Sequence, residues 1–298
     1  MSQNWAADLY GAPHLLPESK QTIPIIQDLI AGTENAKDSA SRVAAVFEDR
    51  IKNGNNETPN GLWVVFCTAV DRLGSDEKVI TLLIDFLLSL ASLNVLDASG
   101  NPIASNSNGD AFWSQLPGFS LVFRDELTSI DNTDSIADAQ WAAEKRRFRN
   151  ANVFQATWLG RVADRGPRRE RLSAQTFALW HISSALDCGV PDTALGRRRT
   201  EMYVPQAAQW VLLAGAVVYR LCREDVENNG EPARERCQGD EAVEGWLWTG
   251  PEGFSLARWA WWRRRFAEIA AMEGVEAEVK GLARSAAERM GEIENSGK

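Results

Sequence analysis

The stretch PQAAQWVLLAGAVVYRLCRE, residues 205–224, decides the fold of this chain. Apolar residues occupy nearly every face of the helix that it predicts, so we expect that helix to be buried at the centre of the molecule. Small side chains such as Ala207 and Ala214 let neighbouring helices approach closely. Gln209 and Arg220 form one polar seam, and a guanidinium in such a place needs a carboxylate, a ligand or water.

Helical spacing of apolar residues dominates the rest of the chain, and no run of alternating β-branched residues indicates a strand. The sequence therefore predicts an all-α protein, an irregular multi-helix bundle around the central apolar helix. We expect helices at residues 23–31, 36–53, 61–73, 77–93, 110–116, 135–162, 173–188, 205–224, 255–272 and 275–294.

A polar stretch, DASGNPIASNSNGD at residues 97–110, is rich in glycine and asparagine and cannot be ordered by burial. It predicts an N-terminal helical segment at 1–98, a polar loop at 99–110 and a main helical domain at 111–298, unless the segment and the main domain pack as one. A second irregular stretch, 228–253, contains two tryptophans, which predict a loop pinned to the helices.

The composition argues against several classes of protein. A net charge of -9 over 298 residues repels nucleic-acid phosphates and anionic membranes, so we expect no nucleic-acid partner. Two histidines and four widely separated cysteines do not indicate a zinc site. Cys67 and Cys222 lie in apolar stretches, so we read the cysteines as reduced thiols and expect no disulfide framework.

Two further features predict a cytoplasmic protein. Residues 1–20 carry acids and two prolines in place of the basic cap and apolar core of a signal peptide. The longest apolar stretch, 79–96, has Asp85 and Ser89 on one stripe, which indicates an amphipathic core helix and no membrane span. The oligomeric state stays open, and a homo-oligomer is compatible with the sequence.

Five segments carry a resemblance to a known family. They are FWSQLPGF at 112–119, FRDEL at 123–127, NANVFQATWLGRV at 150–162, AAQWVLLAG at 207–215 and GPEGFSLARWAWWRRRFAEIA at 250–270. With these segments, which cover most of Asp110 to Glu294, the chain resembles a fungal family of helical proteins catalogued only as a domain of unknown function. The resemblance implies an all-α fold and a filamentous-fungal setting, with natural-product metabolism as one home, and it supplies no reaction or ligand. Function must therefore be argued from the residues.

Aromatic residues form a stripe on the predicted helix after Ser255, a typical N-cap residue. Trp259 and Trp262 lie on this stripe, which is either core packing or the aromatic wall of a pocket.

A second aromatic face lies on the predicted helix at 135–162, where Trp141 and Phe148 share a face with Asn152. An amide in such a place either bonds a neighbouring backbone group or reaches into a cavity. We assign these aromatic residues, with Trp259 and Trp262, to a candidate substrate pocket, and Asn152 to the candidate catalytic groups.

Acidic residues gather in two places. The stretch FRDELTSIDNTDSIAD at 123–138 is either a turn before a capped helix or a site where carboxylates three or four residues apart share Mg²⁺. At the end of the central helix, a second acidic cluster opposes the helix dipole and is badly placed unless it binds something; its members are Glu224, Asp225, Glu227 and Glu231. The candidate Mg²⁺ ligands are Asp125, Asp131, Asp134, Glu224 and Asp225.

Two hypotheses of different classes follow. In the first, a terpene cyclase, a carbon-oxygen lyase, ionises an isoprenoid diphosphate held by Mg²⁺, Arg124 and Arg220, and tryptophan faces stabilise the carbocation. It would be divergent, because neither the DDxxD motif nor the Asn/Ser/Glu motif of ordinary cyclases is complete. In the second, a non-catalytic helical module binds another protein or a small apolar ligand. We take the cyclase as the working hypothesis because it gives the tryptophans, arginines and acids separate roles.

Overall fold

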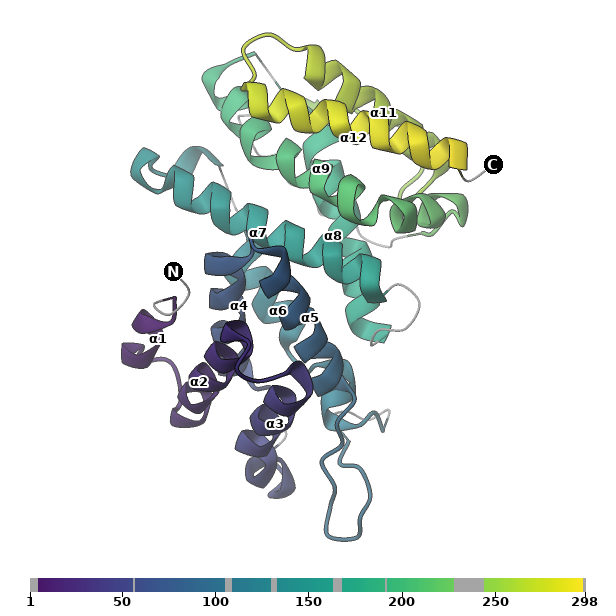
Figure 1. The fold of residues 1–298 in the computed structure, drawn as a ribbon. Helices are drawn as coiled ribbons and strands as arrows, with labels where there is room; N and C mark the ends of the chain where they lie inside the picture. Colours follow the sequence, from purple (N-terminus) through teal and green to yellow (C-terminus); the bar gives the residue numbers. More distant parts are fainter. Residues whose placement is uncertain are drawn as a thin grey trace. The chain divides into compact units, whose positions relative to one another are not determined.

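Helices make up almost all of the regular structure (Figure 1), which confirms the all-α class. The computed structural model describes residues 5–55, 57–104, 109–129, 133–162, 168–190, 192–227 and 244–296. The chain divides into two compact units, the first Met1–Ser129 with Asp164–Arg171 and the second Ile130–Ala163 with Leu172–Lys298. The polar stretch at 99–110, expected to separate two parts, belongs to the first unit.

The first unit consists of short helices, in which α2 packs on α3 and α4, α3 on α5, and α4 on α6. Asn35 and Asp76 cap α3 and α5 by accepting hydrogen bonds from backbone N–H groups of the first turns. In the core, Trp63 lies edge-on to Phe119, and its indole N–H donates to the carbonyl of Pro117 at 2.8 Å. The elements are α1 Ala7–Gly11, α2 Pro17–Ala31, α3 Ala36–Lys52, α4 Asn60–Leu73, α5 Glu77–Ala91, the 3₁₀ turn η1 Phe112–Gln115, α6 Phe119–Phe123 and the π turn η2 Arg124–Thr128.

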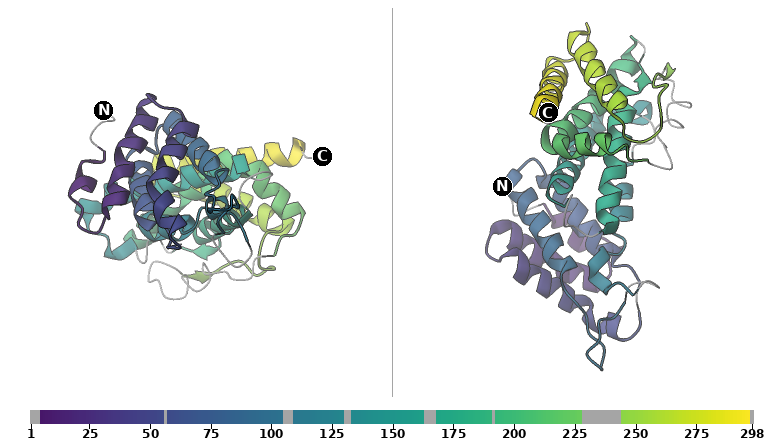
Figure 2. Two further views of the ribbon diagram at one scale, coloured as in Figure 1. Left: turned by 90° about the horizontal axis from the view of Figure 1, so that it is seen from below. Right: turned by 90° about the vertical axis from the view of Figure 1, so that its right-hand side faces the viewer.

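The second unit surrounds α9, which packs against both α7 and α12. Helix α11 packs on α12 as well, and the two run side by side in Figure 1 and Figure 2. Strand β1 pairs with β2 in a minimal antiparallel sheet that joins the segment after α8 to the segment before α11. The elements are η3 Thr133–Ser135, α7 Asp138–Val162, α8 Arg168–Leu186, β1 Cys188–Gly189, α9 Ala194–Arg223, β2 Gly245–Trp246, α11 Leu256–Ala271 and α12 Ala277–Ser296.

Helix α9 is longer than the sequence predicts. It begins at Ala194, where the hydroxyl of the N-cap Thr193 accepts a hydrogen bond from the backbone N–H of Gly196 at 3.1 Å. Pro205, which we expected to start the helix, lies inside it. Proline favours a first helical turn, but it can stand in a helix interior when tertiary packing stabilises the helix on both sides.

The burial of α9 is less complete than its composition predicts. Gly215 faces α12 closely, because a Cβ at this position would lie 2.7 Å from Cδ1 of Ile293. The other side of the helix is open, with Leu213 44% exposed and Arg220 exposed as well. Arg220 belongs to the predicted polar seam, whereas the exposure of Leu213 departs from the apolar pattern.

The other predicted helices agree with the structure to within a few residues at most ends. The largest extension is at α2, which starts at Pro17 in place of residue 23. The predicted helix at 110–116 is only the 3₁₀ turn η1, and α1 and α6 were missed because five residues carry too little periodicity. Among the described helices, none combines the length and the apolarity that crossing a bilayer requires.

The cysteines correct one expectation. Cys67 and Cys222 are free and buried, whereas Cys188 is disulfide-bonded, so the expectation of no disulfide is wrong. Spacing gave no sign of this bond, because disulfide connectivity cannot be deduced from sequence alone. Burial raises the pKa of the Cys222 thiol to about 12 and that of the Cys67 thiol well above its ordinary value. Cys237 lies outside the described residues.

Thiol counting tests this arrangement. We expect two alkylated cysteines when the protein is denatured without reductant, and all four after reduction, because a disulfide takes two of the four. In the native protein Cys67 and Cys222 should stay unmodified at about pH 8, because their thiolate fractions are very small. Mass spectrometry counts the modified cysteines in each sample. Four modified cysteines in the denatured, unreduced protein would contradict the disulfide.

Candidate functional site

An ion pair with no exposed surface joins the end of α8 to the start of α11. Nε and Nη2 of Arg258 donate to Oδ2 of Asp187 at 3.0 and 2.7 Å, and both side chains are 0% exposed. The guanidinium is bonded further, because Nη2 donates to Oγ of Ser183 at 2.9 Å and Nη1 to the carbonyl of Gly253 at 2.8 Å. A buried charge is tolerated under these conditions, with an opposite charge beside it and its donors engaged.

Tryptophans surround this ion pair. Trp261 and Trp262 donate their indole N–H groups to Oδ1 of Asp187 at 3.0 and 2.9 Å. The guanidinium carbon of Arg258 lies 5.5–5.8 Å from the ring centroids of Trp246, Trp248 and Trp262, within the range of cation–π attraction. The prediction that tryptophans pin the irregular stretch before α11 is therefore confirmed for its described part.

Sequence reasoning missed Asp187. One signal was available, since an acid at the C-terminal end of a helix opposes the helix dipole and needs a partner. The partners Arg258 and Trp262 are 71 and 75 residues further along the chain, so no local pattern points to them. Burial raises the pKa of Asp187, and the charge and hydrogen bonds of Arg258 counteract that rise. The cluster holds the end of α8, α11 and the residues just before α11 in place.

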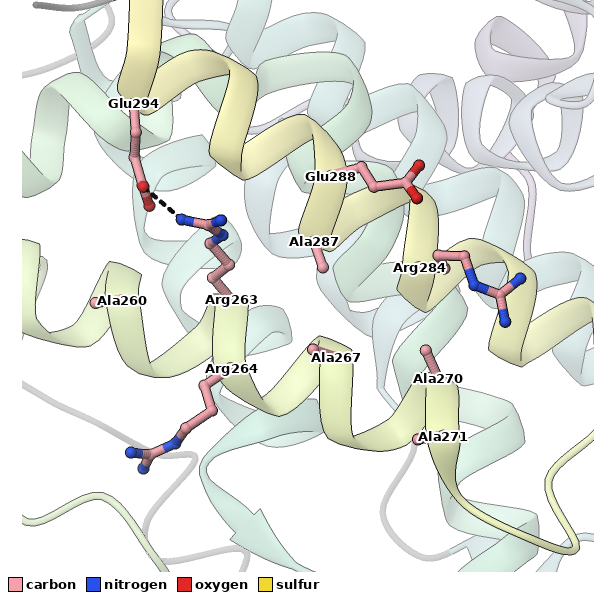
Figure 3. Close-up of a pocket in the computed structure, with 10 residues that line it drawn as sticks. All are labelled: Ala260, Arg263, Arg264, Ala267, Ala270, Ala271, Arg284, Ala287, Glu288 and Glu294. Carbon is pink, nitrogen blue, oxygen red and sulfur yellow. Dashed lines mark hydrogen bonds and ion pairs between the residues drawn. The ribbon is translucent and has the colours of Figure 1, made fainter.

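On another face of α11, a groove of about 760 Å³ opens between α11 and α12 (Figure 3). Its apolar floor consists of alanines, so the groove exists because no large side chain fills the space between the helices. The lining residues are Ala260, Ala267, Ala270 and Ala271 with Arg263 and Arg264 from α11, and Ala287 with Arg284, Glu288 and Glu294 from α12.

An ion pair bridges the two helices at the groove. Nη1 of Arg263 lies 2.6 Å from Oε2 of Glu294, and Figure 3 shows the two side chains meeting between the helices. Oε1 of Glu294 also accepts a hydrogen bond from the buried indole of Trp259 at 3.0 Å. Gly291 leaves room for this contact, because a Cβ there would lie 3.1 Å from the Arg263 guanidinium. The groove is thus tied to the core beneath it.

The arginines beside the groove differ in their partners. Arg264 lies 4.5 Å from the ring centroid of Trp261 and 3.6 Å from a carboxylate oxygen of Glu268. By contrast, the exposed side chains of Arg284 and Glu288 form neither a hydrogen bond nor an ion pair with any described residue.

The aromatic residues assigned to a substrate pocket do not line this groove. Phe148, Trp259 and Trp262 are at most 1% exposed, and their rings pack against other side chains of the core. Trp141 is half-buried, with the guanidinium carbon of Arg198 4.2 Å above its ring. The sequence leaves two interpretations of the stripe after Ser255, core packing or the wall of a pocket. Its residues Trp259 and Trp262 pack in the core.

The candidate catalytic residues are divided between the two units. Asn152 is fully buried, donates from Nδ2 to the carbonyl of Phe148 at 2.8 Å and accepts from the Trp210 indole at 2.8 Å, so it joins α7 to α9. Arg124 pairs with its neighbour Asp125 at 2.8 Å in the first unit, and both are about half exposed. Arg220 is exposed on α9 in the second unit.

The candidate Mg²⁺ ligands are placed as follows. Asp125 belongs to the first unit, whereas Glu224 and Asp225 are exposed where α9 ends in the second. Asp131 and the side chain of Asp134 lie outside the described part of the structure. No three His, Cys, Asp or Glu side chains among the described residues are grouped to hold a metal ion.

Comparison with known proteins gives one match. The sequence model of a family described as "Protein of unknown function (DUF3632)" matches residues 63–266, more than half of the chain, and confirms the resemblance to a domain of unknown function. The match ends within α11, so α12 lies outside it. No curated protein and no solved structure gives a significant match.

Replacing one carboxylate tests the role of the buried ion pair. Asp187→Asn removes the charge that balances Arg258, so we expect the free energy of unfolding to fall by about 3–5 kcal/mol. The matched control Glu292→Gln breaks the exposed pair with Arg289 and should leave stability unchanged within error. Urea unfolding followed by tryptophan fluorescence measures both, and equal stability of the two variants would contradict the assignment.

Proposed function

The chain belongs to the DUF3632 family, whose function is unknown, and we propose that it is a non-catalytic helical module that binds a partner in the groove between α11 and α12. The groove itself carries this proposal. Its volume of about 760 Å³ lies within the range of ligand-binding clefts, which form preferentially between helices in helical proteins.

The lining of the groove indicates the chemistry of a partner. The alanines of α11 and α12 present apolar surface without bulk, so a flat ring, an aliphatic chain or a helix backbone can approach closely. Arg264 and Arg284 beside this floor offer guanidinium groups to anionic or polar groups. An amphipathic partner, with apolar surface on the alanines and charge at its edges, suits both features.

The groove is preorganised by the core beneath it. The indoles of Trp259 and Trp262 on the buried face of α11 donate to Glu294 and Asp187, which fixes the rotation of the helix. Because α11 is held by these buried bonds, binding needs little ordering of the protein, and less binding free energy is lost to conformational entropy.

The Mg²⁺-dependent terpene cyclase stays a prediction, as do the diphosphate-bearing ligand, the fungal natural-product setting and the cytoplasmic location. The disulfide at Cys188 is more typical of an oxidising compartment than of the cytosol. Incubation with Mg²⁺ and geranyl, farnesyl or geranylgeranyl diphosphate decides between the two functions. A binding module releases no pyrophosphate, and release with a cyclised product would overturn our proposal.

Binding of bis-ANS, a dye with apolar rings and two sulfonates, tests the groove directly. We expect the dye to bind the wild-type protein and Ala267→Glu to weaken this binding at least about tenfold, because the new carboxylate fills the floor and repels the sulfonates. Ala45→Glu, at an exposed alanine within α3, is the matched control and should bind like wild type. Equal dye binding by wild type and Ala267→Glu would remove the groove as the binding surface.

A further inference from the structure

The charges beside the α11–α12 groove indicate what occupies it. We propose that α12 of a second copy of this chain lies in the groove, antiparallel to the first α12, so that the protein is a twofold symmetric dimer. This inference rests on the proposed function, because it takes the groove as the binding surface and names its partner. The second copy and bis-ANS compete for the same groove, so the dye is measured at a protein concentration low enough for the monomer to prevail.

The first observation is a pair of opposite charges that the described chain leaves without partners. Arg284 and Glu288 are exposed and lie four residues apart on α12. Figure 3 shows that their charged ends do not meet. Arg263 and Arg264, by contrast, already have Glu294 and Glu268 beside them. The described part of the chain therefore offers one cation and one anion in the groove lining that remain to be paired.

A twofold axis satisfies both charges at once. In a symmetric dimer the same surface of each copy takes part, so that if residue i meets residue j, then j also meets i. Two antiparallel α12 helices centred between Arg284 and Glu288 place each arginine opposite the glutamate of the other copy. Two ion pairs result from one self-complementary surface.

The shape of the groove suits a helix. The alanines of α11 run from Ala260 to Ala271, which at 1.5 Å per residue is roughly 16 Å, or about three helical turns. Small side chains at a helix contact reduce the distance between the helix axes and let the backbones pack closely. Ala287, between the two charged residues on α12, brings the same small surface to the other side of the contact.

Charge favours a second copy over a partner of one sign. The chain as a whole carries -9, and two copies repel each other over most of their surfaces. The groove lining, with three arginines and two glutamates, is nearly neutral, so two copies repel each other little at this surface. An acidic helix would meet Glu288 unfavourably and a basic helix would meet Arg284 unfavourably, whereas a second copy matches both.

Sedimentation of two charge-reversal variants tests the dimer. We expect wild type to sediment as a dimer, and Arg284→Glu and Glu288→Arg each to dimerise at least about tenfold more weakly, because like charges then face each other twice. An equimolar mixture of the two variants should regain the dimer, since the glutamate introduced in one variant then faces the arginine introduced in the other, and the native charges of each also pair. Lys78→Glu, an exposed charge reversal in α5, should sediment like wild type.

The mixture separates this pairing from damage to the fold, because a misfolded variant is not rescued by a second one. A wild-type dimer whose variants fail to recombine would overturn the antiparallel arrangement. A wild-type monomer at about 100 µM that still binds bis-ANS in the groove would overturn the dimer and leave the proposed function standing. A wild-type monomer whose dye binding is unchanged by Ala267→Glu would overturn both the dimer and the proposed function.

Discussion

A carboxylate and a guanidinium that are both removed from water constrain the second unit of this protein. Asp187 and Arg258 must stay together, because either charge alone would be buried without compensation. The requirement extends to the groups that complete their hydrogen bonds, which come from α8, from the segment before α11 and from α11 itself. One pair of charges therefore fixes three segments of chain relative to one another.

This constraint connects the core to the surface. On one side of α11, Trp262 bonds to Asp187, and on another side alanines line the groove. The buried bonds fix the rotation of the helix and therefore decide which side chains line the groove. Glu294 makes a second connection, since one of its oxygens accepts from the buried Trp259 and the other meets Arg263 in the groove lining. The tryptophans of α11, some of which suggested a carbocation pocket, donate hydrogen bonds that orient the helix and with it the face that lines the groove.

The sequence predicted helices well and the site poorly, for physical reasons. Apolar spacing gave most helices because the signal is local, but it placed the start of α9 at Pro205, eleven residues late, because proline favours a first turn. Asp187 went unnoticed because its partners are more than seventy residues away. The groove could not be predicted from the sequence, since alanine is common on helix surfaces. The alanines form a groove only because α11 packs on α12.

Hydrogen–deuterium exchange in Asp187→Asn tests most directly whether this one ion pair holds α11 in position. Our account predicts faster amide exchange at the end of α8, in residues 244–255 and in the first turns of α11, with α3 and α5 of the first unit exchanging as in wild type. Exchange that is unchanged around Asp187, or accelerated equally in both units, would contradict it.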